Sequence, residues 1–343
     1  IWVSEVMLQQ TRAQVVVAYW ERWMRALPDV AALASAPEDR VLKLWEGLGY
    51  YSRVRNLQAA ARMVRARFAG RIPSQFSVLR SLPGVGDYTA GALCSIAFDQ
   101  PVPVVDGNVA RVLTRVWGIS GDPHRRRTRE ILARLATVLV QAAAREPAAR
   151  HRHCADWNQA LMELGAVCCT PRQPDCATCP WRRRCVARRT GRVDAYPNRR
   201  RRPQPVRQEL WVWLLRHQGR FRLRPHPAGR SRSGYWEFPC SEAPPSSASA
   251  AHSGAEPAGR SVRERFRLRH AITRYRYTVH VFAARWTRGL DIPGLPGDGS
   301  RWFRPDEIER LPLSGLHRKI WKRQQLTRDG TGHPARSAHT ARR

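Results

Sequence analysis

The chain has 343 residues, and its 60 Lys and Arg against 27 Asp and Glu give a formal net charge of +33. A chain of this length holds about two domains of ordinary size, and a hydrophobic content of 43% argues against global disorder. The charge favours a polyanionic partner, although 57 of the basic residues are Arg, a bias that genome composition also produces. The net charge is +4 in residues 1–100, +11 in residues 101–200 and +18 in residues 201–343.

No apolar run approaches the roughly 20 residues that span a bilayer, and no secretory signal opens the chain. We therefore expect a cytoplasmic protein without a membrane partner. The chain begins at Ile1 inside a predicted helix, so we expect its N-terminus to be incomplete.

Residues 1–165 are predicted to be mostly helical, because apolar residues recur at helical spacing, as in Val6, Ala13, Val16 and Trp20. Within this region, Leu82-Pro-Gly-Val-Gly86 predicts a turn between two helices. Glycines let a backbone approach a phosphate closely, so the turn suits a helix-hairpin-helix that grips DNA. An ordinary interhelical turn is the alternative. The candidate DNA-binding residues here are Leu82, Gly84, Val85 and Gly86.

Residues 191–206 are basic and rich in Pro, which predicts a linker. After it the pattern changes to short apolar or alternating segments at 210–215, 220–224 and 273–282, which predict strands. Residues 241–260 form a low-complexity insertion, and we expect it and the tail at 329–343 to be disordered.

Five of the eight cysteines lie between residues 168 and 185, and four of them have the spacing C-x6-C-x2-C-x5-C. Clustering of this kind favours a metal site over a disulfide framework. The predicted ligands are Cys169, Cys176, Cys179 and Cys185, and four thiolates satisfy either zinc or a cubane iron–sulfur cluster. Cys168 falls outside the pattern, and we expect the remaining ones to be small packing residues: Cys94, Cys154 and Cys240.

Two carboxylates are candidates for chemistry. Asp106 lies in Val-Val-Asp-Gly-Asn-Val-Ala-Arg, between an apolar segment and a helix start, where it also fits a simple N-cap. Glu5 lies in Ser-Glu-Val-Met-Leu-Gln-Gln-Thr, where an exposed helical Glu is the alternative.

Several motifs in this order resemble the MutY family of adenine DNA glycosylases, in the endonuclease III-like superfamily: SEVMLQQT, GLGYYSRVRNL, LPGVGDYTAGA, VDGNVARVL and NQALMELGAVCCT. The resemblance covers residues 1–190 almost continuously and continues weakly through GYWEFP and LSGLHRKI. It implies an all-α helix-hairpin-helix region at 1–190, a [4Fe–4S] loop at 169–185, and a Nudix-like α/β domain at 207–328. The 6-2-5 cysteine spacing matches the cluster loop of these glycosylases.

The resemblance implies that Glu5 protonates the flipped adenine and that Asp106 stabilises the oxocarbenium ion left on the sugar. The chemistry itself needs such a pair, because adenine leaves poorly as an anion and the sugar becomes cationic. By the same resemblance Tyr88 assists near Asp106, and Asn108 orients that carboxylate; local turn bonding is the alternative for Asn108. Related lyases carry a Lys where this chain has Tyr88, and no Lys occurs between Lys43 and Lys319, so we expect no efficient strand cleavage.

A flipped base leaves a gap in the duplex that a side chain must fill. Leu8, Gln10 and Tyr50 match family positions that insert beside 8-oxoguanine or contact it. The alternative for Tyr50 is a Tyr50–Tyr51 pair packed in the core.

The catalytic Nudix box, G-x5-E-x7-R-E-x2-E-E, is absent from residues 207–328, so pyrophosphate hydrolysis is not expected. The resemblance implies instead a domain that checks for 8-oxoguanine, and the best match to the family's recognition motif is Ile272-Thr273-Arg274. Thr273 keeps the hydroxyl, whereas Ile272 and Arg274 depart from the pattern. His270 is a nearby alternative contact, and we expect Trp236 and Phe238 to be core residues.

The resemblance therefore implies an enzyme that removes adenine mispaired with 8-oxoguanine or G from duplex DNA, as a monomer with one [4Fe–4S] cluster, associated with the nucleoid if the source is bacterial. Two other hypotheses remain open at this point. One is an endonuclease III-like pyrimidine glycosylase with lyase activity, and the other is a non-catalytic iron–sulfur protein that binds DNA.

Overall fold

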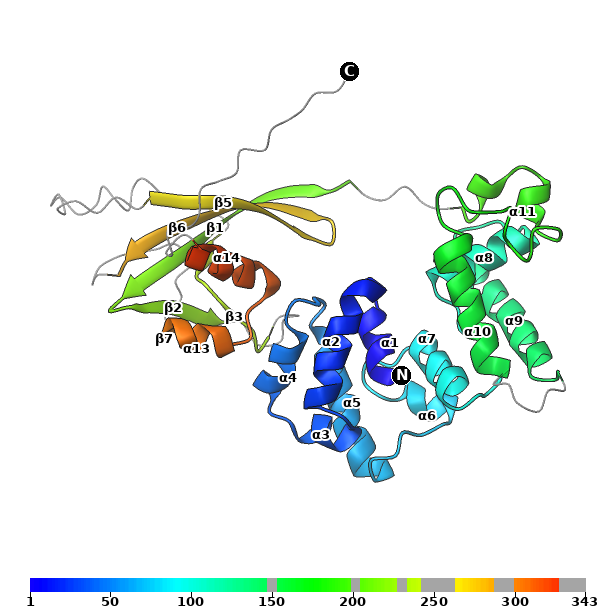
Figure 1. Cartoon of the computed structure of the whole chain (residues 1–343), viewed down its shortest axis with the longest axis horizontal. Coiled ribbons are helices and arrows are strands. Elements are labelled where there is room, and N and C mark those ends of the chain that lie inside the picture. The colour runs from blue at the N-terminus through cyan, green and yellow to red at the C-terminus, as the bar shows by residue number, and fades with distance from the viewer. Residues whose placement is uncertain (147–152, 199–203, 227–232, 242–262, 287–298, 327–343) are drawn as a thin grey trace, which may run out of the picture. The chain divides into compact units, whose positions relative to one another are not determined.

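The computed structural model describes residues 1–146, 153–198, 204–226, 233–241, 263–286 and 299–326 (Figure 1). Its contacts divide the chain into two compact units. Unit 1 comprises Ile1–Ser35 and Arg53–Arg202, and unit 2 comprises Ala36–Ser52 and Pro203–Arg343. The predicted insertion beyond Ser241 and the predicted tail lie outside the described residues.

Unit 1 is helical, as the sequence predicts. Its elements are α1 (Trp2–Leu8), α2 (Ala13–Ala26), α3 (Val30–Ser35), α5 (Ser52–Phe68), α6 (Phe76–Arg80), α7 (Asp87–Ala92), the π-helical turn η1 (Leu93–Ala97), α8 (Gly107–Trp117), α9 (Arg126–Ala143), α10 (His153–Glu163), the π-helical turn η2 (Leu164–Cys168), α11 (Val186–Arg189) and the 3₁₀ turn η3 (Val193–Ala195). Among the described helices of the chain, none has both the length and the apolar character that crossing a bilayer requires.

The core around α8 has a simple origin. Val109, Val112, Leu113 and Val116 recur at helical spacing, so one face of α8 packs against Leu132 and Ala136 of α9 and Leu161 of α10.

Unit 2 holds α4 (Glu38–Trp45) and a mixed seven-stranded sheet. The strands are β1 (Val206–His217), β2 (Arg220–Pro225), β3 (Trp236–Glu237), β4 (Cys240–Ser241), β5 (Arg263–Ile272), β6 (Tyr275–Arg285) and β7 (Arg301–Phe303). The order is β3-β2-β1-β6-β5, with β4 beside β1 and β7 beside β2. Among these described strands the β1–β6 pair is parallel and the other pairs are antiparallel. Within residues 299–326, the sheet is followed by α13 (Pro305–Arg310) and α14 (Gly315–Leu326). The predicted fold class, a helical region followed by a Nudix-like α/β domain, is confirmed.

Alternation along β1 builds two apolar layers, because successive strand residues point to opposite faces. Val212 and Leu214 pack with Ile320 and Trp321 of α14, and α14 lies across the sheet in Figure 1. Trp213 and Leu215 point to the other face, where the partly buried Phe282 and Trp302 pack against them. The predicted core positions are confirmed, since Phe238 is fully buried and Trp236 packs against the same cluster.

The strand predicted at 273–282 begins two residues late. β6 starts at Tyr275, while Thr273 and Arg274 form the turn after β5, and Thr273 has φ +52°. The β-branched Thr273 continued the strand-like composition, but the chain reverses there to pair β5 with β6.

Candidate active site and cysteine loop

Glu5 and Tyr88 meet in unit 1. Glu5 lies on α1 and is 8% exposed, so the exposed-Glu alternative is wrong. The Tyr88 hydroxyl, from α7, donates a hydrogen bond of 2.9 Å to Glu5 Oε2. Burial raises the pKa of Glu5 above its ordinary value; the Tyr88 hydrogen bond opposes that rise and the charge of Asp106 adds to it. A carboxyl that is harder to ionise is suited to donating a proton at neutral pH.

Tyr88 is held as a hydrogen-bond donor. Its hydroxyl also lies 3.6 Å from Met162 Sδ on α10. Burial, and then the negative charge of Glu5, raise the pKa of Tyr88 far above its usual range. The raised pKa favours the protonated phenol, which is the form that donates the hydrogen bond to Glu5.

Asp106 is the N-cap of α8, so the N-cap alternative is correct as a structural description. Its Oδ1 accepts from the Val109 amide at 2.7 Å and its Oδ2 accepts from Asn108 Nδ2 at 3.0 Å. Asn108 thus contacts Asp106, the carboxylate that the sequence analysis expects it to orient. These bonds fix the direction of the carboxylate, and the effect of Asp106 on the pKa of Glu5 places the two acids within electrostatic reach.

Arg111 lies in the VDGNVARVL motif but is not among the predicted site residues. It is 4% exposed, and its guanidinium donates to Asn108 Oδ1 at 2.9 Å, to the Gly165 carbonyl at 2.5 Å and to the Cys169 carbonyl at 2.7 Å. Gly165 allows this approach, because a Cβ there would lie 2.7 Å from the Asn108 Cβ. An Arg inside an apolar helical motif was the available signal, but its partners are distant in sequence.

The last residue of α1 and the segment after the helix carry two of the predicted DNA contacts. Leu8 is 37% exposed, and Gln10 is exposed with φ +59°. Arg53, also absent from the predicted set, donates to the carbonyls of Val6, Met7 and Gln9 at 2.5–3.0 Å. These bonds satisfy the carbonyls that α1 leaves open at its C-terminus, so they fix where the segment leaves the helix.

The predicted hairpin lies between α6 and α7. Leu82 and Val85 are buried anchors, whereas Gly86 is exposed. Gly84 has φ +75°, and a Cβ there would lie 2.6 Å from the Asn56 Cβ, so both the backbone and the space require glycine. The exposed part of the turn is therefore bare backbone.

Tyr50 belongs to unit 2. It is 47% exposed with φ +45°, whereas Tyr51 is 7% exposed. The alternative of a packed pair thus holds for Tyr51 alone.

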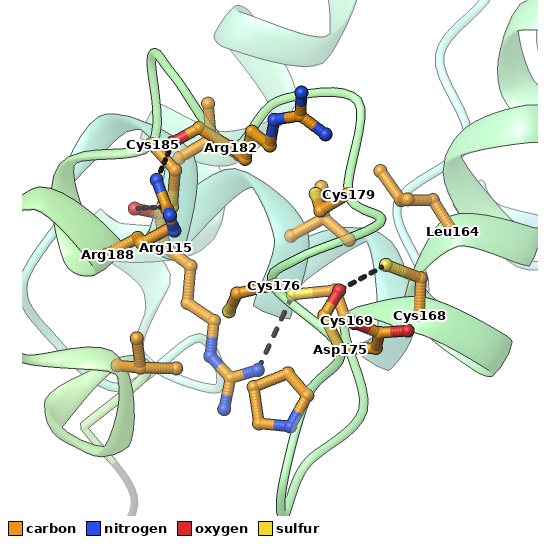
Figure 2. Close-up of a pocket in the computed structure, with 14 residues that line it drawn as sticks. Arg115, Leu164, Cys168, Cys169, Asp175, Cys176, Cys179, Arg182, Cys185 and Arg188 are labelled. Carbon is orange, nitrogen blue, oxygen red and sulfur yellow. Dashed lines mark hydrogen bonds between the residues drawn. The ribbon is translucent and has the colours of Figure 1, made fainter.

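The four predicted ligands line one pocket, together with Cys168 (Figure 2). None of the eight cysteines, all of which lie in the described ranges, forms a disulfide. Arg115 Nη1 lies 3.4 Å from Cys169 Sγ, and Arg182 and Arg188 also line the pocket. The Cys168 thiol donates to the Asp175 carbonyl at 3.1 Å, and the thiol of Cys185, one of the four, donates to the Arg115 carbonyl at 3.4 Å. Burial raises the pKa of Cys179 to about 11, so the loop needs cations to hold thiolates.

This donor set fits an anionic metal–thiolate group. Four sulfurs gather within one short loop, and guanidinium groups beside them offset the negative charge of four thiolates. Cys94 and Cys154 are fully buried packing residues, as predicted, and Cys240 packs partly buried against the unit 2 core.

The predicted lesion-recognition residues lie on the exposed β5–β6 turn of unit 2. The Thr273 hydroxyl donates to the Ile272 carbonyl at 2.7 Å, and Arg274 lies over the Tyr275 ring at 5.2 Å. His270 lies on β5, three residues earlier.

Comparisons with known proteins agree with this organisation. Residues 3–137 match the HhH-GPD superfamily of base excision DNA repair proteins, and residues 210–323 match the NUDIX domain. The chain is 48% identical over 203 residues to the adenine DNA glycosylase of Mus musculus, a match that covers 58% of this chain and 38% of the mouse protein. It is 31% identical over 221 residues to the adenine DNA glycosylase of Buchnera aphidicola subsp. Schizaphis graminum, covering 64% of this chain and 61% of that protein.

A solved thermostable thymine-DNA glycosylase is 28% identical, with a TM-score of 0.48, and the match covers 55% of this chain and 83% of that one. The chain thus spans about two fifths of the length of the mouse relative and about three fifths of the Buchnera one.

Proposed function

We propose that this chain, which belongs to the MutY family of adenine DNA glycosylases, removes adenine mispaired with 8-oxoguanine or G in duplex DNA and leaves an abasic site. The observation that carries the proposal is the buried Glu5, bonded to Tyr88 and within electrostatic reach of Asp106. Departure of a purine requires two acids in different surroundings. One gives a proton to the base, and the other stabilises the positive charge that develops on the sugar.

Glu5 supplies the proton. Tyr88 occupies Oε2, so Oε1 is the oxygen that donates to a ring nitrogen of the extruded adenine. Protonation makes the base neutral as it leaves, and the raised pKa of Glu5 keeps more of the acid form at neutral pH.

Asp106 faces the sugar after the base departs. Val109 and Asn108 hold both of its oxygens before the reaction, so little reorganisation is needed when positive charge develops on the sugar. Water then completes the hydrolysis.

Strand cleavage is outside this mechanism. An amine must attack the sugar to form a Schiff base, and Tyr88 stands where related lyases carry a Lys. Its hydroxyl is committed to Glu5. We infer a monofunctional enzyme.

The cysteine loop would hold one [4Fe–4S] cluster through Cys169, Cys176, Cys179 and Cys185, and its role there is to order the loop. Arg115 supports this role from the protein side, because it also donates to the Thr170 carbonyl at 2.7 Å. The hairpin at 82–86 and the segment Leu8–Gln10 would contact the duplex, while Tyr50, Thr273 and Arg274 would contact the 8-oxoguanine strand.

The test is a single-turnover assay on three duplexes, with A opposite 8-oxoguanine, A opposite G, and thymine glycol. We expect fastest release of adenine opposite 8-oxoguanine, and no covalent complex on borohydride treatment. Preference for thymine glycol would refute the substrate, and a borohydride-trapped complex would refute the monofunctional mechanism.

A further inference from the structure

The segment that carries Tyr50 is shared between the two family matches. Ala36–Ser52 falls within the residues that match the HhH-GPD superfamily, yet it packs in unit 2 with the Nudix-like domain. Its contacts there lie on both sides of Tyr50.

The first contact joins Glu46 to Arg318 of α14. Arg318 Nε and Nη2 reach the two carboxylate oxygens of Glu46, the second at 3.2 Å, and both side chains are 10% exposed. The Leu313 amide adds a bond of 3.2 Å to Glu46 Oε2. Arg318 is itself held by Glu309 Oε2 at 3.0 Å. A two-pronged, buried pair of this kind fixes direction as well as distance.

The second contact joins Tyr51 to the start of α14. The Gly315 amide donates to the Tyr51 hydroxyl at 2.8 Å, and the Tyr51 ring lies 4.0 Å from that of Tyr235. The fully buried Tyr235 in turn donates to the Leu42 carbonyl of α4 at 2.9 Å.

Tyr50 lies between these contacts in a tight turn. Gly47 and Gly49 have φ +102° and +71°, Tyr50 itself has φ +45°, and Trp45 Nε1 donates to the Gly49 carbonyl at 3.1 Å. A left-handed backbone at a bulky residue is unfavourable and persists where its surroundings impose it. Here the fixed neighbours Glu46 and Tyr51 impose it, and the Tyr50 ring is left 47% exposed.

We propose that Arg318 and the Gly315 amide are positioning groups for Tyr50, which they aim into the duplex by fixing Glu46 and Tyr51. The inference rests on the proposed function, in which Tyr50 fills the stack beside the lesion. In this proposal the Nudix-like domain acts on the opened duplex through Tyr50, a residue that precedes the residues matched to the NUDIX domain. Arg318 is buried, and in this proposal it acts through Glu46 and not by contact with the reacting atoms.

The test uses the full chain and the variants Arg318→Met and Tyr50→Ala, alone and combined. Arg267→Met is the matched control, because Arg267 pairs with Glu264 on the surface of the same unit. We expect Arg318→Met to slow single-turnover release of adenine opposite 8-oxoguanine about tenfold. In the Tyr50→Ala background the same change should cost less than about twofold, because the group it positions is gone. Equal losses in both backgrounds would overturn the proposal.

A spectroscopic measurement tests the proposal without relying on catalysis. The duplex pairs 8-oxoguanine with a 2′-fluoro adenosine, which the enzyme cannot cleave, and carries 2-aminopurine next to the 8-oxoguanine. The fluorescence of 2-aminopurine then reports whether a ring is stacked at that position. Arg318→Met and the milder Tyr51→Phe should each shift its fluorescence toward the Tyr50→Ala value, while Arg267→Met keeps the wild-type value. Wild-type fluorescence in both variants would refute the positioning role. A wild-type protein that releases no adenine would refute the proposed function, and the fluorescence would still decide the placement of Tyr50.

Discussion

Glu5→Gln separates a proton donor from a group that only orients the base. Gln has nearly the volume of Glu, and its carbonyl oxygen still accepts the hydrogen bond that Tyr88 makes at 2.9 Å. The buried site therefore keeps its packing and loses one acidic proton.

The size of the effect distinguishes the two roles. A positioned general acid contributes about 10²–10⁴-fold, which is about 2.7–5.5 kcal/mol at the usual 1.36 kcal/mol per factor of ten. Loss of an ordinary hydrogen bond costs about 0.5–1.5 kcal/mol, or roughly 2- to 13-fold. We expect the larger range, because burial raises the pKa of Glu5 and so preserves a proton that Gln lacks.

The assay is single-turnover release of adenine opposite 8-oxoguanine, with DNA affinity measured separately. A loss below about tenfold would refute proton donation by Glu5. Thermal unfolding supplies an independent check with a definite sign. Because the pKa of Glu5 is higher in the folded protein than its ordinary 4.5, rising pH ionises the unfolded chain first and destabilises the wild type. The Gln variant escapes this loss, so its advantage in Tm should appear above pH 4.5 and vanish below it.

Three further changes test the rest of the site. Asp106→Asn should slow adenine release by about 10²–10³-fold in the same assay while Tm changes little, since Asn also caps helices well; near-normal rates would remove Asp106 from the mechanism. Tyr88→Phe deletes a bond that lowers the pKa of Glu5, so the alkaline limb of the pH–rate profile should move to higher pH, and a shift to lower pH would contradict this role. Cys176→Ser should abolish bound iron and sulfide, whereas the adjacent-thiol control Cys168→Ser should retain both in elemental analysis; stoichiometric zinc in the wild type would refute the cluster.

Local patterns in the sequence predicted local structure well. Periodicity separated the helical unit from the sheet, and residues 210–215 and 220–224 fall within β1 and β2. The turn at 82–86 could be predicted because its cause is local: Gly84 has a positive φ, which glycine adopts readily. The cysteine spacing likewise brings its own thiols into one pocket.

Long-range contacts were beyond such reasoning. The hydrogen bond to the buried Glu5 comes from Tyr88, 83 residues away in sequence. Arg111 donates to the side chain of Asn108 and to the backbone carbonyl of Cys169, 58 residues away, and a backbone acceptor does not depend on which side chain its residue carries. Assignment of Ala36–Ser52 to unit 2 follows from partners such as Arg318, 272 residues from Glu46. The spacing of apolar residues within a single helix or strand cannot predict contacts between residues so far apart in the sequence.

The buried guanidinium groups change how the charge of +33 should appear in binding measurements. Arg53, Arg111, Arg115 and Arg318 are each at most 9% exposed, and all of them donate to backbone carbonyls inside the protein. They displace no counterions from a phosphate backbone, so the dependence of affinity on salt concentration should report fewer contacts than the formal charge suggests. At these positions a forked, multiply bonding cation joins backbone carbonyls within the protein, so part of the Arg excess makes internal contacts and is not available to DNA.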